Sequence, residues 1–347
     1  WLRVSLEPES KQRQTVPANQ RASGLGRTTT SAQAAVSVVR VAACSASRAR
    51  VAVMIMKSLL VLGAAAGAPL PQLGRFATQS ARVYVGGFAN KSDSQDALIY
   101  WPLDADDATP ARNVVAFAHG MNAGGNETRP AYDALLTTLA SYGLVVIAPL
   151  SCTEDFCGPE LAQDLGTALE RCAANRSLAP GLVSANFTRV GVAGHSMGGA
   201  AAGYVAASPN VTARYGVRAY VGMHGTPTPV EANVTVPTLY TTGALDDIIR
   251  PSVVKTSFAR SANASPRAFV ELADADHFEP TNPRPGHMRL NPYAAAFLLC
   301  HVSGDDASCS RIYDATDAAS LCDAYADQTS PPAGACGIVG GPDAPAR

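Results

Sequence analysis

The sequence predicts an α/β protein with a mostly parallel central sheet and helices on both faces. Short apolar runs alternate with longer amphipathic segments along residues 69–328, and this alternation is typical of successive βαβ units. Some runs, such as residues 144–150, contain no polar residue, as expected for strands that are buried on both faces. A body of this length corresponds to one large domain rather than two small ones.

The predicted elements follow one another in a regular order. Two early strands are predicted at 81–87 and 96–104, because β-branched and aromatic residues there are bounded by turn formers. Further strands are predicted at 113–120, 144–150, 217–225 and 236–244, with a last strand and its loop at 267–277. Helical spacing occurs at 129–143, 158–175, 250–262 and 291–302. Residues 189–207 read as a strand followed directly by a helix.

The two ends of the chain differ from this body. Residues 1–55 carry seven arginines and one lysine against two acids, a composition that predicts disorder in an untranslated or targeting extension. Residues 56–68 have the pattern of a signal peptide, with an organelle transit peptide or a membrane anchor as the alternatives. The folded α/β body is expected at 69–328. Residues 329–347, rich in Pro, Gly and Ala, are expected to form a tail held by Cys336.

Two counts predict passage through the secretory route. Seven of the twelve asparagines stand in Asn-x-Ser/Thr sequons, where chance gives about one or two. These are Asn90, Asn126, Asn175, Asn186, Asn210, Asn233 and Asn263. Seven of the eight cysteines lie beyond residue 68, and their spacing suggests the bridges 152–157, 300–309 and 322–336, with Cys172 left over. Free buried thiols are the alternative.

A serine stands between glycines at the junction of the strand and the helix in 189–207. Gly194-His195-Ser196-Met197-Gly198 fits the G-x-S-x-G pattern, in which the serine occupies a strained turn that needs small neighbours. Alone, such a pentapeptide arises by chance in about one chain of this size in five or six. A serine hydroxyl also needs a base and a carboxylate that orients the base.

Candidates for these partners follow two later strands in the required order. Asp246 ends one strand and His277 the next, which makes Ser196, Asp246 and His277 the predicted catalytic residues. Asp247 is the second choice for the acid and is available to cap the helix at 250–262. No grouping of His, Asp and Glu has metal-ligand spacing.

The remaining site predictions concern the oxyanion and the pocket. The backbone N–H groups of Met121 and Met197 are expected to bind the oxyanion, and Asn122 and His224 are possible pocket-lining residues. The other histidines are expected to have structural roles: His119 orders its loop, and His195 packs or forms hydrogen bonds.

Together these motifs resemble the α/β-hydrolase superfamily along residues 80–312. The resemblance is to its cutinase-like, polyester hydrolase and dienelactone hydrolase group, with chlorophyllases nearby. It rests on HGMNAGG, GHSMGG, TTGALDDIIRP, ADHFEPTN and CHVSGDDASC. It implies an α/β-hydrolase fold with eight strands and a cofactor-free ester hydrolase that forms an acyl-enzyme. Met197 stands where chlorophyllases carry arginine, and MHGTPTP replaces the tryptophan segment of bacterial polyester hydrolases.

The sequence therefore predicts a secreted serine esterase, of the lipase or cutinase type, that acts as a monomer on small or polymeric esters without cofactor or metal. A net charge of −1 and the lack of a basic cluster in the body argue against a nucleic-acid partner. One alternative is an inactive binding glycoprotein on the same scaffold. Another is a triad hydrolase that acts on chlorophyll-type esters, peptides or thioesters, because acyl transfer uses the same apparatus.

Overall fold

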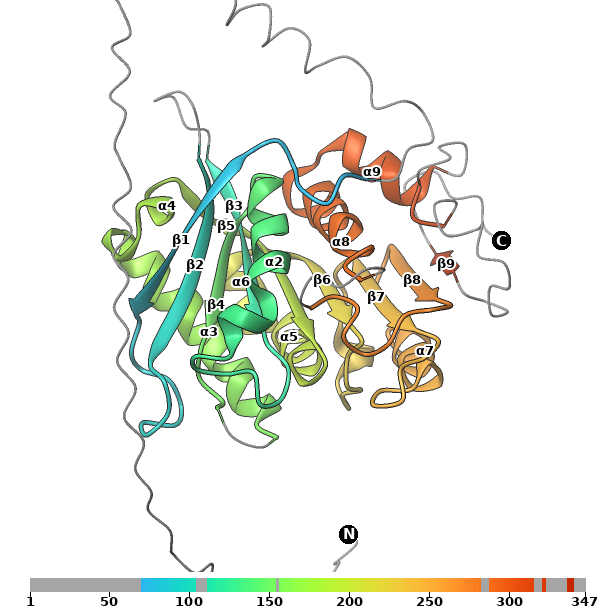
Figure 1. Cartoon of the computed structure of the whole chain (residues 1–347), viewed down its shortest axis with the longest axis horizontal. Coiled ribbons are helices and arrows are strands. Elements are labelled where there is room, and N and C mark those ends of the chain that lie inside the picture. The colour runs from blue at the N-terminus through green and yellow to red at the C-terminus, as the bar shows by residue number, and fades with distance from the viewer. Residues whose placement is uncertain are drawn as a thin grey trace, which may run out of the picture. The chain divides into compact units, whose positions relative to one another are not determined.

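The residues that the structure describes form one sheet of nine strands flanked by helices (Figure 1). The structure is a computed structural model and describes residues 70–103, 111–153, 156–281, 287–314, 320–322 and 336–339. The spatial order of the strands is β1-β2-β4-β3-β5-β6-β7-β8-β9. All neighbouring pairs from β4 to β8 are parallel, whereas β1–β2, β2–β4 and β8–β9 are antiparallel. The mostly parallel sheet is therefore confirmed.

The strands agree closely with the apolar runs of the sequence. They are β1 Ala77–Tyr84, β2 Asp96–Leu103, β3 Arg112–Ala118, β4 Val145–Pro149, β5 Ala185–His195, β6 Val217–Met223, β7 Thr238–Gly243, β8 Arg267–Leu272 and β9 Cys336–Val339. Every residue of β4 and β7 is buried. Burial on both faces explains why these runs show no alternation of polar and apolar residues.

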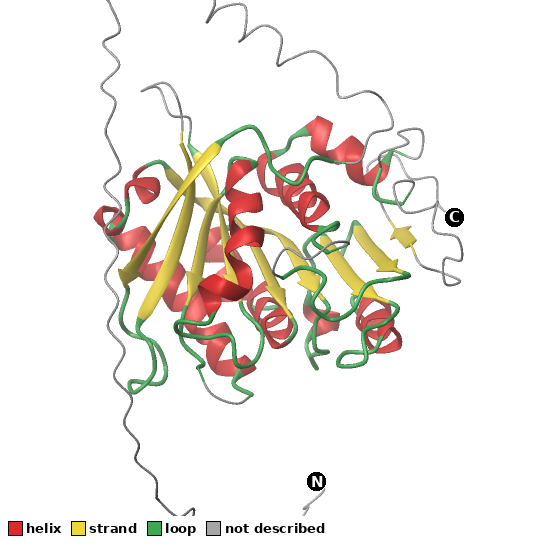
Figure 2. Ribbon diagram, in the orientation of Figure 1, coloured by secondary structure: helices red, strands yellow, loops and turns green. Residues whose placement is uncertain are grey.

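Helices cover both faces of the sheet (Figure 2). One face packs against α3 Gly158–Ala174, α5 Met197–Ala206, α6 Pro209–Tyr215 and α7 Pro251–Arg260. The other packs against α2 Thr128–Ser141, α8 Asn291–Leu298 and α9 Asp306–Tyr313. Each helix contributes its apolar side to one of two buried clusters, as Leu161 and Val254 do on the first face and Leu135 and Phe297 on the second.

Three short helices carry too little sequence for a helical period and were not predicted. They are α4 Pro180–Val183, α6 and α9. The side chain of Ser208 caps α6 by accepting a hydrogen bond from the N–H of Val211, and Asp305 caps α9 through the N–H of Ser308. These caps satisfy donors that a short helix leaves exposed.

The sheet has one strand more than the family resemblance implied. Cys336–Val339 pairs antiparallel with β8, with Cys336 opposite Val270. Four residues in a segment rich in Pro, Gly and Ala carry no strand signal of their own. The edge of β8 and the Cys322–Cys336 disulfide supply the pairing that makes them a strand.

The suggested disulfides are all present. Cys152–Cys157, Cys300–Cys309 and Cys322–Cys336 are bonded, and Cys172 is a free, buried cysteine. Burial raises the pKa of the Cys172 thiol to about 12, so it remains protonated and packs as a small apolar side chain on α3.

Some predictions fall outside the described residues. Those for residues 1–68 do so entirely, and of the tail at 329–347 only 336–339 are described. None of the helices in the described ranges has the length and apolar character needed to cross a bilayer.

Candidate active site

Ser196 lies in the sharp turn between β5 and α5. Its backbone has φ 57° and ψ −124°, a left-handed conformation that costs a non-glycine residue about 1–3 kcal/mol. Its N–H donates to the carbonyl of Met223 at 2.9 Å, and its own carbonyl accepts from the N–H groups of Gly199 and Thr226 at 2.9 and 3.0 Å. These bonds hold a strained serine at the carboxyl end of β5, where parallel sheets place their chemistry.

The glycines around the serine allow α5 to begin directly behind it. A Cβ on Gly194 would collide with the carbonyl oxygen of Gly198, and a Cβ on Gly198 would collide with the carbonyl of Ala118 on β3. Met197 is the first residue of α5, so its N–H has no acceptor within the helix. The positive end of the helix dipole lies at the same point and favours negative charge there.

The loop after β3 lies against the serine. A Cβ on Gly120 would stand 3.3 Å from the Cβ of Ser196, so the loop lies close to the turn and leaves little room for a side chain at position 120. Met121 and Asn122 follow, and both are exposed. The structure therefore brings Met121 and Met197, the two predicted oxyanion donors, next to the residues that form this contact.

Asp246 and His277 come from the loops after β7 and β8 and meet in the interior. Their side chains are joined by a hydrogen bond of 2.9 Å between Nδ1 of His277 and Oδ2 of Asp246, and the two residues are only 3% and 2% exposed. A carboxylate can only accept, so Nδ1 of His277 carries the proton. This tautomer leaves Nε2 of His277 as the basic nitrogen.

The charge of Asp246 is stabilised by several donors. Burial would raise the pKa of its carboxyl, but hydrogen bonds from His224, His277 and the backbone outweigh burial and hold the pKa well below its usual range. Oδ1 accepts from the N–H groups of Ile248 and Ile249 at 3.0 and 2.7 Å. Asp247 is exposed and does not cap α7, whose N-cap is Arg250 without a side-chain bond.

A chain of hydrogen bonds links the three loops that carry the site. The N–H of Gly120 donates to the hydroxyl of Tyr132 at 2.8 Å, and that hydroxyl lies 2.7 Å from Nδ1 of His195. Nε2 of His195 lies 2.8 Å from the carbonyl of His277. Because that carbonyl can only accept, Nε2 of His195 is the donor and Nδ1 accepts from Tyr132. His195 thus has the hydrogen-bonding role predicted for it.

Tyr132 was not singled out from the sequence. It occupies a sheet-facing position of α2 and is buried, and in the sequence it looks like an ordinary core aromatic. Burial raises the pKa of its hydroxyl above the usual value, so the hydroxyl keeps the proton that His195 accepts. Only the folded chain shows that this proton lies between the Gly120 loop and the serine turn.

Replacing Tyr132 with phenylalanine should lower kcat for a nitrophenyl ester by about 10-fold, because the Gly120 loop loses its anchor and small displacements are costly in catalysis. Stability should also fall by about 1–3 kcal/mol, since two buried groups lose a partner. Steady-state kinetics and urea unfolding measure the two effects.

Tyr142→Phe is the matched control, because its hydroxyl bonds the carbonyl of Pro71 away from the site. It should retain the kcat of the original chain. An unchanged kcat in Tyr132→Phe would restrict Tyr132 to a structural role.

His224 does not line an open pocket, contrary to the expectation from the sequence. Its side chain is completely buried, and Nδ1 lies 2.8 Å from Oδ2 of Asp246. Its backbone has a φ of 48° directly after the end of β6. The residue therefore supports the acid.

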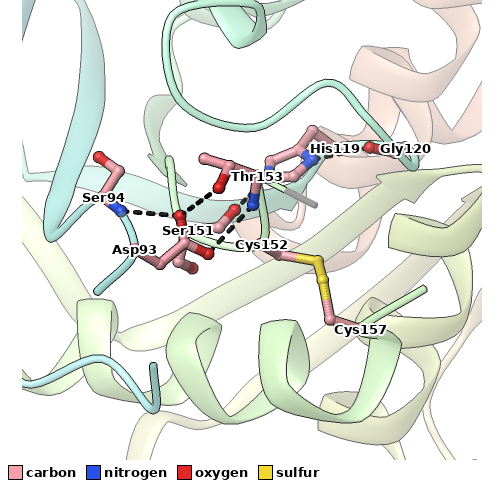
Figure 3. The surroundings of a disulfide bond; sticks show 8 residues. All are labelled: Asp93, Ser94, His119, Gly120, Ser151, Cys152, Thr153 and Cys157. Atoms are coloured by element: carbon pink, nitrogen blue, oxygen red, sulfur yellow. Dashed lines mark hydrogen bonds between the residues drawn. A yellow bond between two sulfur atoms is a disulfide. The ribbon is translucent and has the colours of Figure 1, made fainter. Parts of the chain in front are cut away.

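The Cys152–Cys157 disulfide closes a loop beside the Gly120 loop (Figure 3). The imidazole of His119 lies between the two loops, with its nitrogens 2.8 Å from the carbonyl of Gly120 and 2.7 Å from that of Ser151. Burial lowers the pKa of His119, so the ring is neutral and its single N–H donates to one of these carbonyls. His119 orders its loop, as predicted.

A buried acid, Glu279, follows His277 closely and was also not predicted. Its Oε1 accepts from the N–H of Leu290 at 3.1 Å, and its carbonyl accepts from the N–H of Met288 at 2.7 Å. Burial raises the pKa of its carboxyl to about 7. Glu279 thereby connects the loop that carries His277 to the start of α8.

One group of side chains has metal-ligand spacing among the described residues. The ligand atoms of His224, Asp246 and His277 lie within 4.8 Å of one another. Both Nδ1 atoms already donate to Asp246, so a metal ion at these atoms would have to replace both hydrogen bonds.

The fold and the site define the class of protein. A mostly parallel sheet with helices on both faces, a serine in a left-handed turn after β5, and an acid and a histidine after β7 and β8 characterise an α/β-hydrolase. Residues 70–329 match the family model described as PET hydrolase-like, and the chain belongs to this family. No curated protein matches the chain. Family membership supports the hydrolysis of ester bonds as its activity.

Proposed function

We propose that the chain is a secreted serine esterase that cleaves carboxylic esters through Ser196, His277 and Asp246. The observation that carries the proposal is the buried hydrogen bond between His277 and Asp246, close to a serine held in a left-handed turn. The position of His195 supports the proximity of Ser196 and His277, because His195 directly precedes Ser196 in the chain and donates a hydrogen bond to the carbonyl of His277.

The chemistry follows from these positions. Nε2 of His277 takes the proton of the Ser196 hydroxyl while the oxygen attacks the ester carbonyl carbon. The N–H groups of Met121 and Met197 bind the resulting oxyanion, and each such donor is typically worth about 10²–10³ in rate. His277 then returns the proton to the leaving alcohol, and an acyl-enzyme remains. Water, deprotonated by the same nitrogen, releases the acid.

Apolar side chains around these positions support a substrate with an apolar acyl or aryl part. Four of the ten large apolar side chains that are exposed in the described part of the chain stand within two residues of a proposed site residue. They are Met121, Leu245, Ile248 and Phe278. Small aryl or acyl esters and polyesters such as PET, after which the family is named, have this character.

Disulfides and sequons support passage through the secretory route. Three disulfides are present among the described residues, as is usual for extracellular proteins. Six of the seven sequon asparagines are exposed. The exception is Asn186, which is half-buried and donates through Nδ2 to Asn113 at 3.1 Å. We propose glycans at the six exposed positions.

Labelling with a fluorophosphonate tests the proposal, because only an activated serine reacts with this probe. The tryptic peptide 190–214 contains Ser196 and also Ser208, an internal control. Glycans are removed first, since Asn210 lies on the same peptide. We expect one label per chain, on Ser196, and none after heat denaturation. Unlabelled native protein, or a label on another residue, would contradict the proposal.

A further inference from the structure

His224 forms a second hydrogen bond to the oxygen that His277 uses. Nδ1 of His224 lies 2.8 Å and Nδ1 of His277 lies 2.9 Å from Oδ2 of Asp246. The ring planes of the two histidines are nearly perpendicular, at 89°. One carboxylate oxygen therefore serves two imidazoles that come from different loops.

The proton positions follow from the chemistry of the carboxylate. Asp246 is ionised because its pKa lies well below the usual range, so both imidazoles donate to it from Nδ1–H. Burial lowers the pKa of His224, and the neighbouring carboxylate offsets this only in part. His224 is thus a neutral donor. Its Nε2 is buried and has no hydrogen-bond partner among the described residues.

The backbone keeps His224 in this position. Its φ of 48° lies in the left-handed region, which is uncommon for residues other than glycine, and its N–H donates to the carbonyl of Thr241 on β7 at 2.8 Å. The N–H of Asp246 donates to the carbonyl of Gly243 at the end of the same strand. The backbones of the donor residue and the acceptor residue are therefore both anchored to β7.

We propose that His224 is a positioning residue that holds Asp246 and limits the negative charge that Oδ2 presents to His277. This inference rests on the proposed function. An oxygen that accepts a hydrogen bond from a neutral donor stabilises a neighbouring imidazolium less than an oxygen that does not. His224 therefore extends activity toward acid conditions.

The other titratable groups around His224 do not account for this extension of activity toward acid conditions. The titratable groups that face it are Asp246, His277, His195 and Asp276. Burial, together with the two neighbouring histidines, holds the pKa of His195 well below its usual range, so His195 stays neutral where the enzyme is assayed. Asp276 is half-buried with 42% of its side chain exposed, so its field is partly screened by solvent.

A matched pair of variants separates the hydrogen bond from the bulk of the side chain. His224→Asn keeps a donor at the place of Nδ1 and tolerates the left-handed backbone, whereas His224→Leu removes the donor. The measurement is kcat/KM for a nitrophenyl ester from pH 4.5 to 9. In the leucine variant, the midpoint of the acid limb of the pH profile should rise by about one pH unit. A shift of this size corresponds to the free energy of about one hydrogen bond to a charged group.

The asparagine variant should restore the midpoint of the original chain. An unchanged or lowered midpoint in the leucine variant, with fluorophosphonate labelling of Ser196 intact, would overturn the role of His224 and leave the proposed function standing. Absence of labelling in the original chain would instead refute the proposed function itself.

A second measurement needs no folded leucine variant. Nitrogen-15 histidine spectra of the original chain at pH 7, with His224→Asn to assign the signal, should show His224 protonated on Nδ1 and bare on Nε2. The opposite tautomer would overturn the proposal, because Nδ1 would then be unable to donate to Asp246.

Discussion

Replacing Ser196 with alanine is expected to lower kcat for a nitrophenyl ester by about 10⁴-fold or more, as when the nucleophile of a catalytic triad is removed. The hydroxyl is the only part of the side chain that is lost, so KM should change little. Initial rates over a range of ester concentrations provide the measurement. The fold should persist, because the bonds that hold Ser196 in its turn all come from its backbone.

Ser208→Ala serves as the control for this experiment. Ser208 caps α6, so its loss should reduce stability by about 1 kcal/mol and leave kcat unchanged. Thermal unfolding of both variants shows whether each is folded at the assay temperature. An alanine variant at position 196 that kept more than about one hundredth of the original rate would exclude Ser196 as the nucleophile.

Replacing Asp246 with asparagine should lower kcat by a comparable factor of about 10⁴, because the amide no longer selects the Nδ1–H tautomer of His277. The neutral side chain also leaves the imidazolium of the transition state without its counter-charge. The asparagine side chain would also face His224. If its NH₂ group takes the place of Oδ2, it meets the Nδ1–H groups of His224 and His277, and neither of these can accept a hydrogen bond from it.

The neighbouring acid provides a close control. Asp247 differs from Asp246 by one position and is exposed, so Asp247→Asn should retain the original kcat. The comparison of Asp246→Asn with Asp247→Asn also decides which of the two aspartates is the catalytic acid, a choice that the sequence left open. A larger loss in Asp247→Asn than in Asp246→Asn would reverse the assignment of the acid.

The elements and the order of the site residues were accessible from the sequence because their signals are local. A G-x-S-x-G segment between a strand and a helix places Ser196 in a turn that requires small residues on either side. Asp246 and His277 each follow an apolar run that forms a parallel strand, and the carboxyl ends of such strands meet at one edge of a sheet. None of these arguments needs to know which strands are neighbours.

Residues that act through contacts far along the chain left no such signal. Tyr132 is separated from His195 by 63 positions, and in the sequence it is one more apolar position of an amphipathic helix. His224 follows β6 in the same way that a pocket residue would, and only the close approach of the loops after β6 and β7 shows that its imidazole points at Asp246. The strand at Cys336–Val339 likewise exists only because β8 offers it a partner.

By itself the sequence determined the α/β class, the approximate positions of eight of the nine strands and the residues proposed for the reaction, and it suggested the three disulfide pairs. Periodicity, glycine placement and cysteine spacing depend on neighbours within a few residues, and the chain records them directly. The tertiary structure alone decided that His224 and His277 share the carboxylate of Asp246. It also decided that the hydroxyl of Tyr132 lies between Gly120 and His195, and that β9 covers the edge of β8. Those outcomes depend on distances of less than 3 Å between residues that lie from 12 to 82 positions apart, and packing of the whole sheet sets such distances.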